Sequence, residues 1–237
     1  MKPVAIFRHA PTEGPGYFAT YLSRHGIPWR MVKIDEGEAV PNDPLAFSGM
    51  AFMGGPMSVN DDLPWISGVL DLIRAGVDAD VPVIGHCLGG QLMSKALGGE
   101  VTRNPVKEIG WGRVDVPQNG VAGEWFGGLS SFDSFHWHGE TFSIPPGATC
   151  ILSSPHCVNQ AFVLDGHLGM QCHVEMTPKL IRAWCEDWGR EVESLARRMP
   201  SVQTPAQMTD MVEEKTRTLN VVADRIYGRW TSGLENR

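Results

Sequence analysis

Residues 85–91 place a cysteine in a distinctive local setting. The segment reads GHCLGGQ, so Cys87 has a glycine two positions before it and two positions after it. This is the pattern of a nucleophile elbow, G-x-nucleophile-x-G. A sharp turn from strand to helix strains the backbone of the middle residue, and side chains at the flanking positions would collide. Cys87 is therefore a candidate nucleophile.

An elbow would favour reaction at Cys87 in two ways. The thiol would lie beside the N-terminus of a helix, where free N–H groups favour a thiolate. The N–H of Leu88 would point to where an oxyanion develops during attack on a carbonyl. The same pattern also fits a small core cysteine in a glycine-rich turn. Whether Cys87 is a nucleophile therefore depends on whether the sequence also supplies a base for it.

A cysteine nucleophile needs a base and a group that orients the base. Among the eight histidines, His173 has a carboxylate, Glu175, two positions away in the sequence GMQCHVE. On a strand the two side chains would share a face with Cα atoms roughly 6.5–7 Å apart, a gap that glutamate can span. His167 also has a carboxylate nearby, Asp165, but the sequence DGHLG favours a solvated turn. His173 and Glu175 are thus the predicted base and its orienting group.

The elements that must position these residues alternate in the first half of the chain. Helices are predicted after residue 12, over 63–77 from apolar spacing of three and four, and over 91–97. Apolar runs predict strands over residues 4–7, 29–34, 50–53 and 81–84. Such alternation predicts an open, mostly parallel sheet with helices on both faces. Residues 54–59 and 85–91 each follow a strand, where sites of such sheets lie.

The second half of the chain has a different pattern. Short strands with many turns over residues 101–174 predict antiparallel strands added to the main sheet. Apolar residues then recur at helical spacing over 180–199 and 208–226. We expect one domain over residues 1–237, with a core of about 1–178 and a helical C-terminal extension of about 179–237.

Charge and composition exclude two classes of function. The net charge of −7 argues against a nucleic-acid partner. No apolar run is long enough to span a membrane, and the first ten residues do not resemble a signal peptide. The five cysteines are odd in number and follow neither a disulfide framework nor a zinc pattern. We therefore expect free thiols and a cytoplasmic protein.

Together these segments resemble the class I (triad) glutamine amidotransferase family, in particular free-standing members similar to the glutaminase domain of GMP synthase. The family elbow, G-[apolar]-C-[L/F]-G-x-Q, matches residues 85–91. The family histidine motif, Q-x-H-P-E, matches residues 171–175, QCHVE, and the family G-G-P loop matches residues 54–56. The resemblance covers residues from about 45 to 175 and implies the flavodoxin-like fold of this family.

The resemblance also implies a role for each matching residue. Cys87 would attack the γ-carboxamide carbon of L-glutamine. His173, oriented by Glu175, would carry the thiol proton to departing ammonia, and water would hydrolyse the γ-glutamyl thioester. The N–H groups of Gly55 and Leu88 would hold the oxyanion. Positions that contact the substrate in the family correspond to Gln91, Trp137, His138 and Gly139.

The match departs from the family pattern at several positions. His86 replaces an apolar residue, and we expect it to pack as a polar side chain beside the cleft. Val174 replaces the usual proline, which removes no chemistry, and Cys172 is expected to be a packed bystander. Some 60 residues follow Glu175. We expect these helices to pack against the domain, with a docking surface for another protein as the alternative.

Three functions fit the sequence. The first is glutamine hydrolysis that releases ammonia for an acceptor or a partner synthase. The second is hydrolysis of a γ-glutamyl peptide by the same triad, which an open cleft near residues 136–140 would favour. The third is a non-catalytic thiol protein with Cys87 as an oxidation sensor, although a sensor needs no charge-oriented base.

The sequence predicts neither a cofactor nor a metal. The loop GGPMSV lacks the lysine of a phosphate-binding Walker loop. The HWH spacing of His136 and His138 would suit a metal on a strand. No third or fourth ligand is evident in the sequence, so no metal site is expected.

Overall fold

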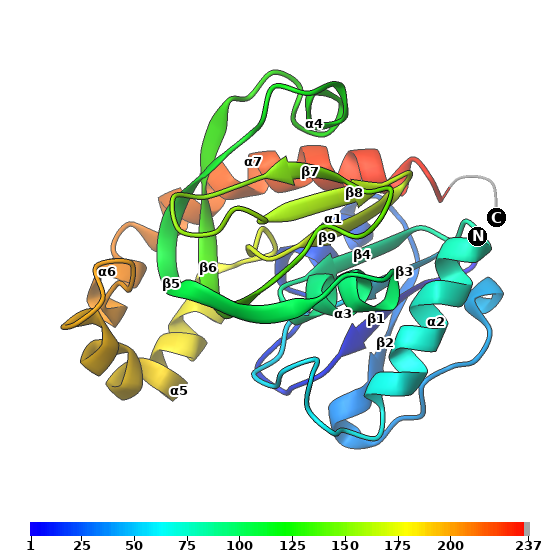
Figure 1. The fold of residues 1–237 in the computed structure, drawn as a ribbon, viewed down its shortest axis with the longest axis horizontal. Helices are drawn as coiled ribbons and strands as arrows, with labels where there is room; N and C mark the ends of the chain where they lie inside the picture. Colours follow the sequence, from blue (N-terminus) through cyan, green and yellow to red (C-terminus); the bar gives the residue numbers. More distant parts are fainter. Residues whose placement is uncertain (235–237) are drawn as a thin grey trace.

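The computed structural model describes residues 1–234. Its elements follow in the order β1 (Val4–Arg8), α1 (Gly16–Arg24), β2 (Trp29–Lys33), η1 (Ile34–Glu36), η2 (Pro44–Ala46), β3 (Gly49–Phe52), α2 (Ile66–Asp78), β4 (Val83–His86), α3 (Leu88–Ala96), β5 (Val101–Asp115), α4 (Gly120–Phe126), β6 (Ser131–Phe142), β7 (Thr149–Leu152), β8 (Ala161–Leu164), β9 (His167–Met170), α5 (Pro178–Ala196), α6 (Pro205–Thr209) and α7 (Val212–Thr231). Figure 1 shows their arrangement.

The main sheet has seven strands in the order β2-β1-β3-β4-β9-β8-β7. The first five are parallel to one another, and β8 and β7 are added through antiparallel pairings. The chain moves from β1 to β2 on one side and then to β3 on the other, so the strand order reverses at β1. Ligands of open parallel sheets bind at the carboxyl ends of the strands near such a reversal.

Side chains of the central strands alternate between two hydrophobic cores. In β1, Val4 and Ile6 pack with α1, α4 and α7, whereas Ala5 and Phe7 pack with α2 and α3. Helices therefore cover both faces of the sheet, as Figure 1 shows. The prediction of an α/β fold with a mostly parallel sheet is confirmed.

The second half of the chain differs in part from the expectation. The long strands β5 and β6 pair with each other in a separate two-stranded sheet, with an irregularity between Arg103 and Glu108, and isolated bridges link them to other segments. Strand β9 joins the main sheet parallel to β4 rather than as an added antiparallel strand. The short helix α4 was not predicted. These pairings join segments that are far apart in the chain, which local patterns cannot reveal.

The C-terminal helices pack on the body of the protein. Tyr227 and Trp230 of α7 are fully buried, and their rings contact Phe18 of α1 at centroid distances of 4.8 and 5.7 Å. Helix α5 buries Ile181, Trp184 and Val192 in the same core. Within residues 1–234, no helix is long and apolar enough to cross a membrane.

Candidate active site

Cys87 lies at the turn between β4 and α3, at the carboxyl end of the sheet. Its φ of 51° and ψ of −108° place a non-glycine residue in a strained conformation with positive φ. A Cβ at Gly85 would overlap the backbone of Gly89, and a Cβ at Gly89 would overlap the carbonyl of Phe52. The two glycines are therefore required by close backbone approach, and the strain falls on Cys87 as expected for an elbow.

His173 and Glu175 meet as their spacing suggested, although not on a strand. Strand β9 ends at Met170, and His173 forms only an isolated bridge with Phe135 of β6. The assumption of a continuous strand was wrong, yet His173 Nδ1 lies 2.6 Å from Glu175 Oε1. Both side chains are almost completely buried.

The charges of this pair reinforce each other. Burial alone would lower the pKa of His173, but the carboxylate of Glu175 and the thiol of Cys87 raise it well above its usual value. Burial alone would raise the pKa of Glu175, but His173 and then His86 keep it below its usual value. The Nε2 atom of His173 has no hydrogen-bond partner within residues 1–234. The ring can therefore accept a proton at Nε2 while Glu175 holds Nδ1.

Trp184 and His86 pack against the pair, and Tyr227 contacts His86. The ring of Trp184 lies edge-on to His173 at a centroid distance of 5.1 Å. His86 is a packed polar side chain, as expected, and it lies fully buried behind the pair. Its Nε2 is 3.9 Å from Glu175 Oε2 and 3.2 Å from the Tyr227 hydroxyl. Burial lowers the pKa of His86, and its packing beside Glu175 Oε2 limits the movement of that carboxylate.

Of the two predicted oxyanion donors, Gly55 lines the cavity, and Leu88 directly follows Cys87. Leu88 is the first residue of α3, and Gly55 follows β3. Neither N–H donates a hydrogen bond to another group in the described part of the chain. Free N–H groups beside a nucleophile are the arrangement that an oxyanion hole requires. Their role in catalysis stays a prediction.

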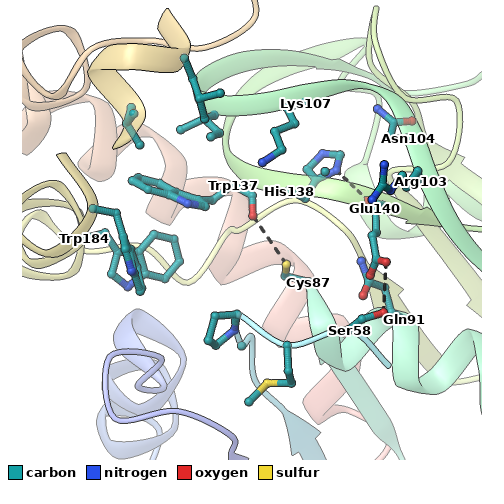
Figure 2. A pocket seen from close by; sticks show the side chains of 18 of the residues that line it. Ser58, Cys87, Gln91, Arg103, Asn104, Lys107, Trp137, His138, Glu140 and Trp184 are labelled. Atoms are coloured by element: carbon teal, nitrogen blue, oxygen red, sulfur yellow. Dashed lines mark hydrogen bonds between the residues drawn. The ribbon is translucent and has the colours of Figure 1, made fainter. Parts of the chain in front are cut away.

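The predicted substrate contacts divide into two groups. Gln91 lines the cavity, and its Nε2 donates to Gln171 Oε1 at 3.0 Å. Gln171 Nε2 in turn lies 3.5 Å from Cys87 Sγ, a link that the sequence analysis missed. The carbonyl oxygen of Trp137 points toward Cys87 Sγ at 4.0 Å, as Figure 2 shows. These groups offer donors and acceptors on the wall around the thiol.

The side chain of His138 has a different environment. Its Nδ1 lies 3.0 Å from the carbonyl oxygen of Glu140 and its Nε2 lies 3.1 Å from Glu108 Oε2. At Gly139 a side chain would meet Lys107. Both ring nitrogens of His138 therefore have partners within the protein.

The reason given for expecting no metal at His136 and His138 needs correction. A third buried side chain, Glu108, comes within metal-ligand range of both rings. However, the amide nitrogen of Gln160 lies 2.8 Å from Glu108 Oε2 and 3.4 Å from a nitrogen of each histidine. A hydrogen-bond donor thus fills the centre of the cluster. The expectation of no metal stays a prediction.

The cavity above Cys87 has a volume of about 890 Å³. It is lined by Cys87, His173 and Gly55, by residues of α5 and by residues from segment 103–107 of β5. Sequence reasoning missed several of the residues that line it, including Glu13, Arg103, Lys107, Trp184 and Trp188. The rule that sites follow parallel strands would have drawn attention to Glu13, because it lies in the loop after β1.

The family model of class-I glutamine amidotransferases matches residues 18–186. The chain belongs to this family. The prediction of a class I glutamine amidotransferase, an enzyme that hydrolyses a C–N bond, is therefore confirmed, and so is the resemblance seen in the sequence.

Solved structures similar to the chain include two glutamine amidotransferases. A glutamine amidotransferase from Methylobacillus flagellatus is 45% identical, with a TM-score of 0.97 over 100% of this chain and 97% of that one. A second, from Thermotoga maritima, is 24% identical and shares the fold with a TM-score of 0.87 over 99% of both chains.

Relatives known from sequence include a glutamine amidotransferase-like protein, YfeJ, from Salmonella typhimurium. It is 28% identical over 73% of this chain and 75% of its own length. The GMP synthase of Bacillus pumilus is 34% identical over 56% of this chain, but the match spans only 25% of that enzyme. The similarity to GMP synthase is thus confined to about a quarter of the synthase.

Proposed function

We propose that this protein hydrolyses the γ-carboxamide of L-glutamine through a cysteine thioester. Cys87 Sγ attacks the carbonyl carbon, and the oxyanion accepts hydrogen bonds from the N–H groups of Gly55 and Leu88. His173 takes the thiol proton and delivers it to the nitrogen as the C–N bond breaks, releasing ammonia. Water, deprotonated by His173, then attacks the thioester and releases glutamate.

One observation carries this proposal. A cysteine with strained backbone at a helix N-terminus faces the same cavity as a buried histidine whose Nδ1 is held by a carboxylate at 2.6 Å. A core cysteine needs none of these features, and an oxidation sensor needs no oriented base. The arrangement therefore favours covalent acyl transfer.

The test is glutamate release from L-glutamine by the purified protein, with Cys87→Ala as control. The proposal requires release that Cys87→Ala abolishes, and a γ-glutamyl adduct on Cys87 detected by mass spectrometry after rapid acid quenching. Release that persists in the variant, or an adduct elsewhere, contradicts it.

A second candidate, hydrolysis of γ-glutamyl amides with larger leaving groups, is favoured by the size of the cavity. At about 890 Å³ it lies in the range of about 300–1,000 Å³ that suits drug-sized ligands, which are larger than glutamine. Its wall includes Trp137, Trp184 and Trp188, whose rings lie 5.4–6.1 Å from one another. A panel of γ-glutamyl peptides compared with L-glutamine by kcat/KM decides between the two.

The proposal also covers the domain organisation, the fate of the ammonia and the cellular location. Residues 1–237 form one domain, with a core of about 1–178, and the packing of α7 against α1 supports this. Released ammonia passes to an acceptor or to a partner synthase, as the similarity to part of GMP synthase suggests. The reaction takes place in the cytoplasm, which the five free cysteines support.

A further inference from the structure

The loop between β1 and α1 carries a buried carboxylate that the proposed mechanism does not use. Glu13 is 8% exposed and lines the same cavity as Cys87 and His173. Burial raises the pKa of Glu13 to about 7, with His173 lowering it and Glu175 raising it. No hydrogen bond from the described residues compensates for this burial. A buried carboxylate without a hydrogen-bond donor is destabilising, so a ligand that donates to it is the expected compensation.

The position of this carboxylate relates it to the leaving group. A Cβ built on Gly54 would lie 2.5 Å from Glu13 Oε2 and 3.5 Å from His173 Cε1. Glu13 therefore lies over Gly54, beside the edge of the imidazole that joins its two nitrogens. Gly54 directly precedes Gly55, a predicted oxyanion donor. Since His173 Nε2 must reach the departing nitrogen, an acceptor beside this ring lies on the leaving-group side of the scissile bond.

The loop that carries Glu13 is fixed to the segments that carry the triad. The carbonyl of Thr12 accepts a hydrogen bond from Trp184 Nε1 at 2.9 Å, and the same indole packs on His173. Beyond Glu13, the N–H of Tyr17 donates to the carbonyl of Glu175 at 2.7 Å. Glu13 is therefore held in register with His173 and Glu175 without any bond to its own carboxylate. Such preorganisation is typical of groups that bind a reacting centre.

We propose that Glu13 is a specificity residue that accepts a hydrogen bond from the N–H of the scissile γ-amide. This rests on the proposed function, and it defines the substrate class as γ-glutamyl compounds whose scissile nitrogen carries a hydrogen. Holding one N–H leaves the nitrogen lone pair free to turn toward His173 as the C–N bond breaks. The product glutamate has no such N–H, and its γ-carboxylate is repelled by the ionised form of Glu13, which favours release above a pH of about 7.

The experiment compares an amide with an ester, because an ester has no N–H to donate. Release of glutamate from L-glutamine and from L-glutamate γ-methyl ester is measured for the wild type, Glu13→Gln and Glu13→Met. In Glu13→Met we expect kcat/KM for L-glutamine to fall about 10- to 100-fold, as for loss of a hydrogen bond to a charged group. For the ester it should change by less than about threefold. Glu13→Gln keeps an acceptor oxygen and should lie between the wild type and Glu13→Met.

Product inhibition gives a second readout. Neither variant can carry the negative charge, so above a pH of about 7, where Glu13 is ionised, L-glutamate should inhibit both variants more strongly than the wild type. A purely structural role of Glu13 would lower amide and ester cleavage together. That result, or no effect on either substrate, overturns the inference about Glu13 but leaves the proposed function intact. If the wild type cleaves neither substrate in a Cys87-dependent manner, the proposed function itself is contradicted. The smaller change in Glu13→Gln keeps the test decisive if Glu13→Met does not fold.

Discussion

The charge of Glu175, rather than its shape, should set the rate of the proposed reaction. Glu175→Gln keeps an oxygen that can accept from His173 Nδ1, which now lies 2.6 Å away. The variant removes only the negative charge that stabilises the imidazolium. With charges about 4 Å apart and an effective dielectric constant of about 20, Coulomb's law gives about 4 kcal/mol. At about 1.4 kcal/mol per factor of ten, kcat should fall on the order of 10³-fold.

The assay is steady-state glutamate release, with thermal unfolding measured in parallel. Glu108→Gln is a matched control, because Glu108 is also a buried glutamate 3.1 Å from a histidine, His138, but lies outside the triad. It should lower kcat by less than tenfold. A folded Glu175→Gln variant that loses less than tenfold, or no more than Glu108→Gln, would refute the assignment of Glu175 as the orienting charge.

Three further outcomes follow from burial and close packing. Gly89→Ala places a methyl group on the carbonyl of Phe52. In urea unfolding it should lower the free energy of unfolding by at least about 1–3 kcal/mol, and unchanged stability would contradict the elbow geometry. Cys172 is fully buried with a pKa raised to about 12 by burial, so iodoacetamide should label Cys87 in the folded protein and leave Cys172 unlabelled in peptide maps. Burial lowers the pKa of His9 and His136 from 6.5 to about 4. Between these pH values the unfolded state binds more protons than the folded state. The free energy of unfolding should therefore fall as the pH is lowered through this window, by up to about 3 kcal/mol per histidine. The raised pKa of Glu13 acts in the opposite direction, so a net fall of Tm from pH 6.5 to 4 is expected, and a flat or rising Tm would contradict it.

The sequence predicted those parts of the site whose signals are local. The glycines around Cys87 lie within two positions of it, and a short interval also joins His173 to Glu175. Side chains so close along the chain are constrained by the backbone itself, so their spacing was informative even where the element was misassigned. His167 shows the limit of such reasoning. It was expected in a solvated turn, yet it begins β9, is buried, and accepts a hydrogen bond from the Val83 N–H.

The sequence by itself determined the alternation of strands and helices, the elbow and the pairing of a base with its carboxylate, because each follows from a repeat or spacing of a few residues. Only the tertiary structure decided what surrounds them. Glu13 comes beside His173 across 160 positions, and Gln160 reaches Glu108 across 52. Contacts over such separations depend on how the strands order themselves in the sheet. The free energy that selects that order is distributed over two whole cores, and no short segment encodes it.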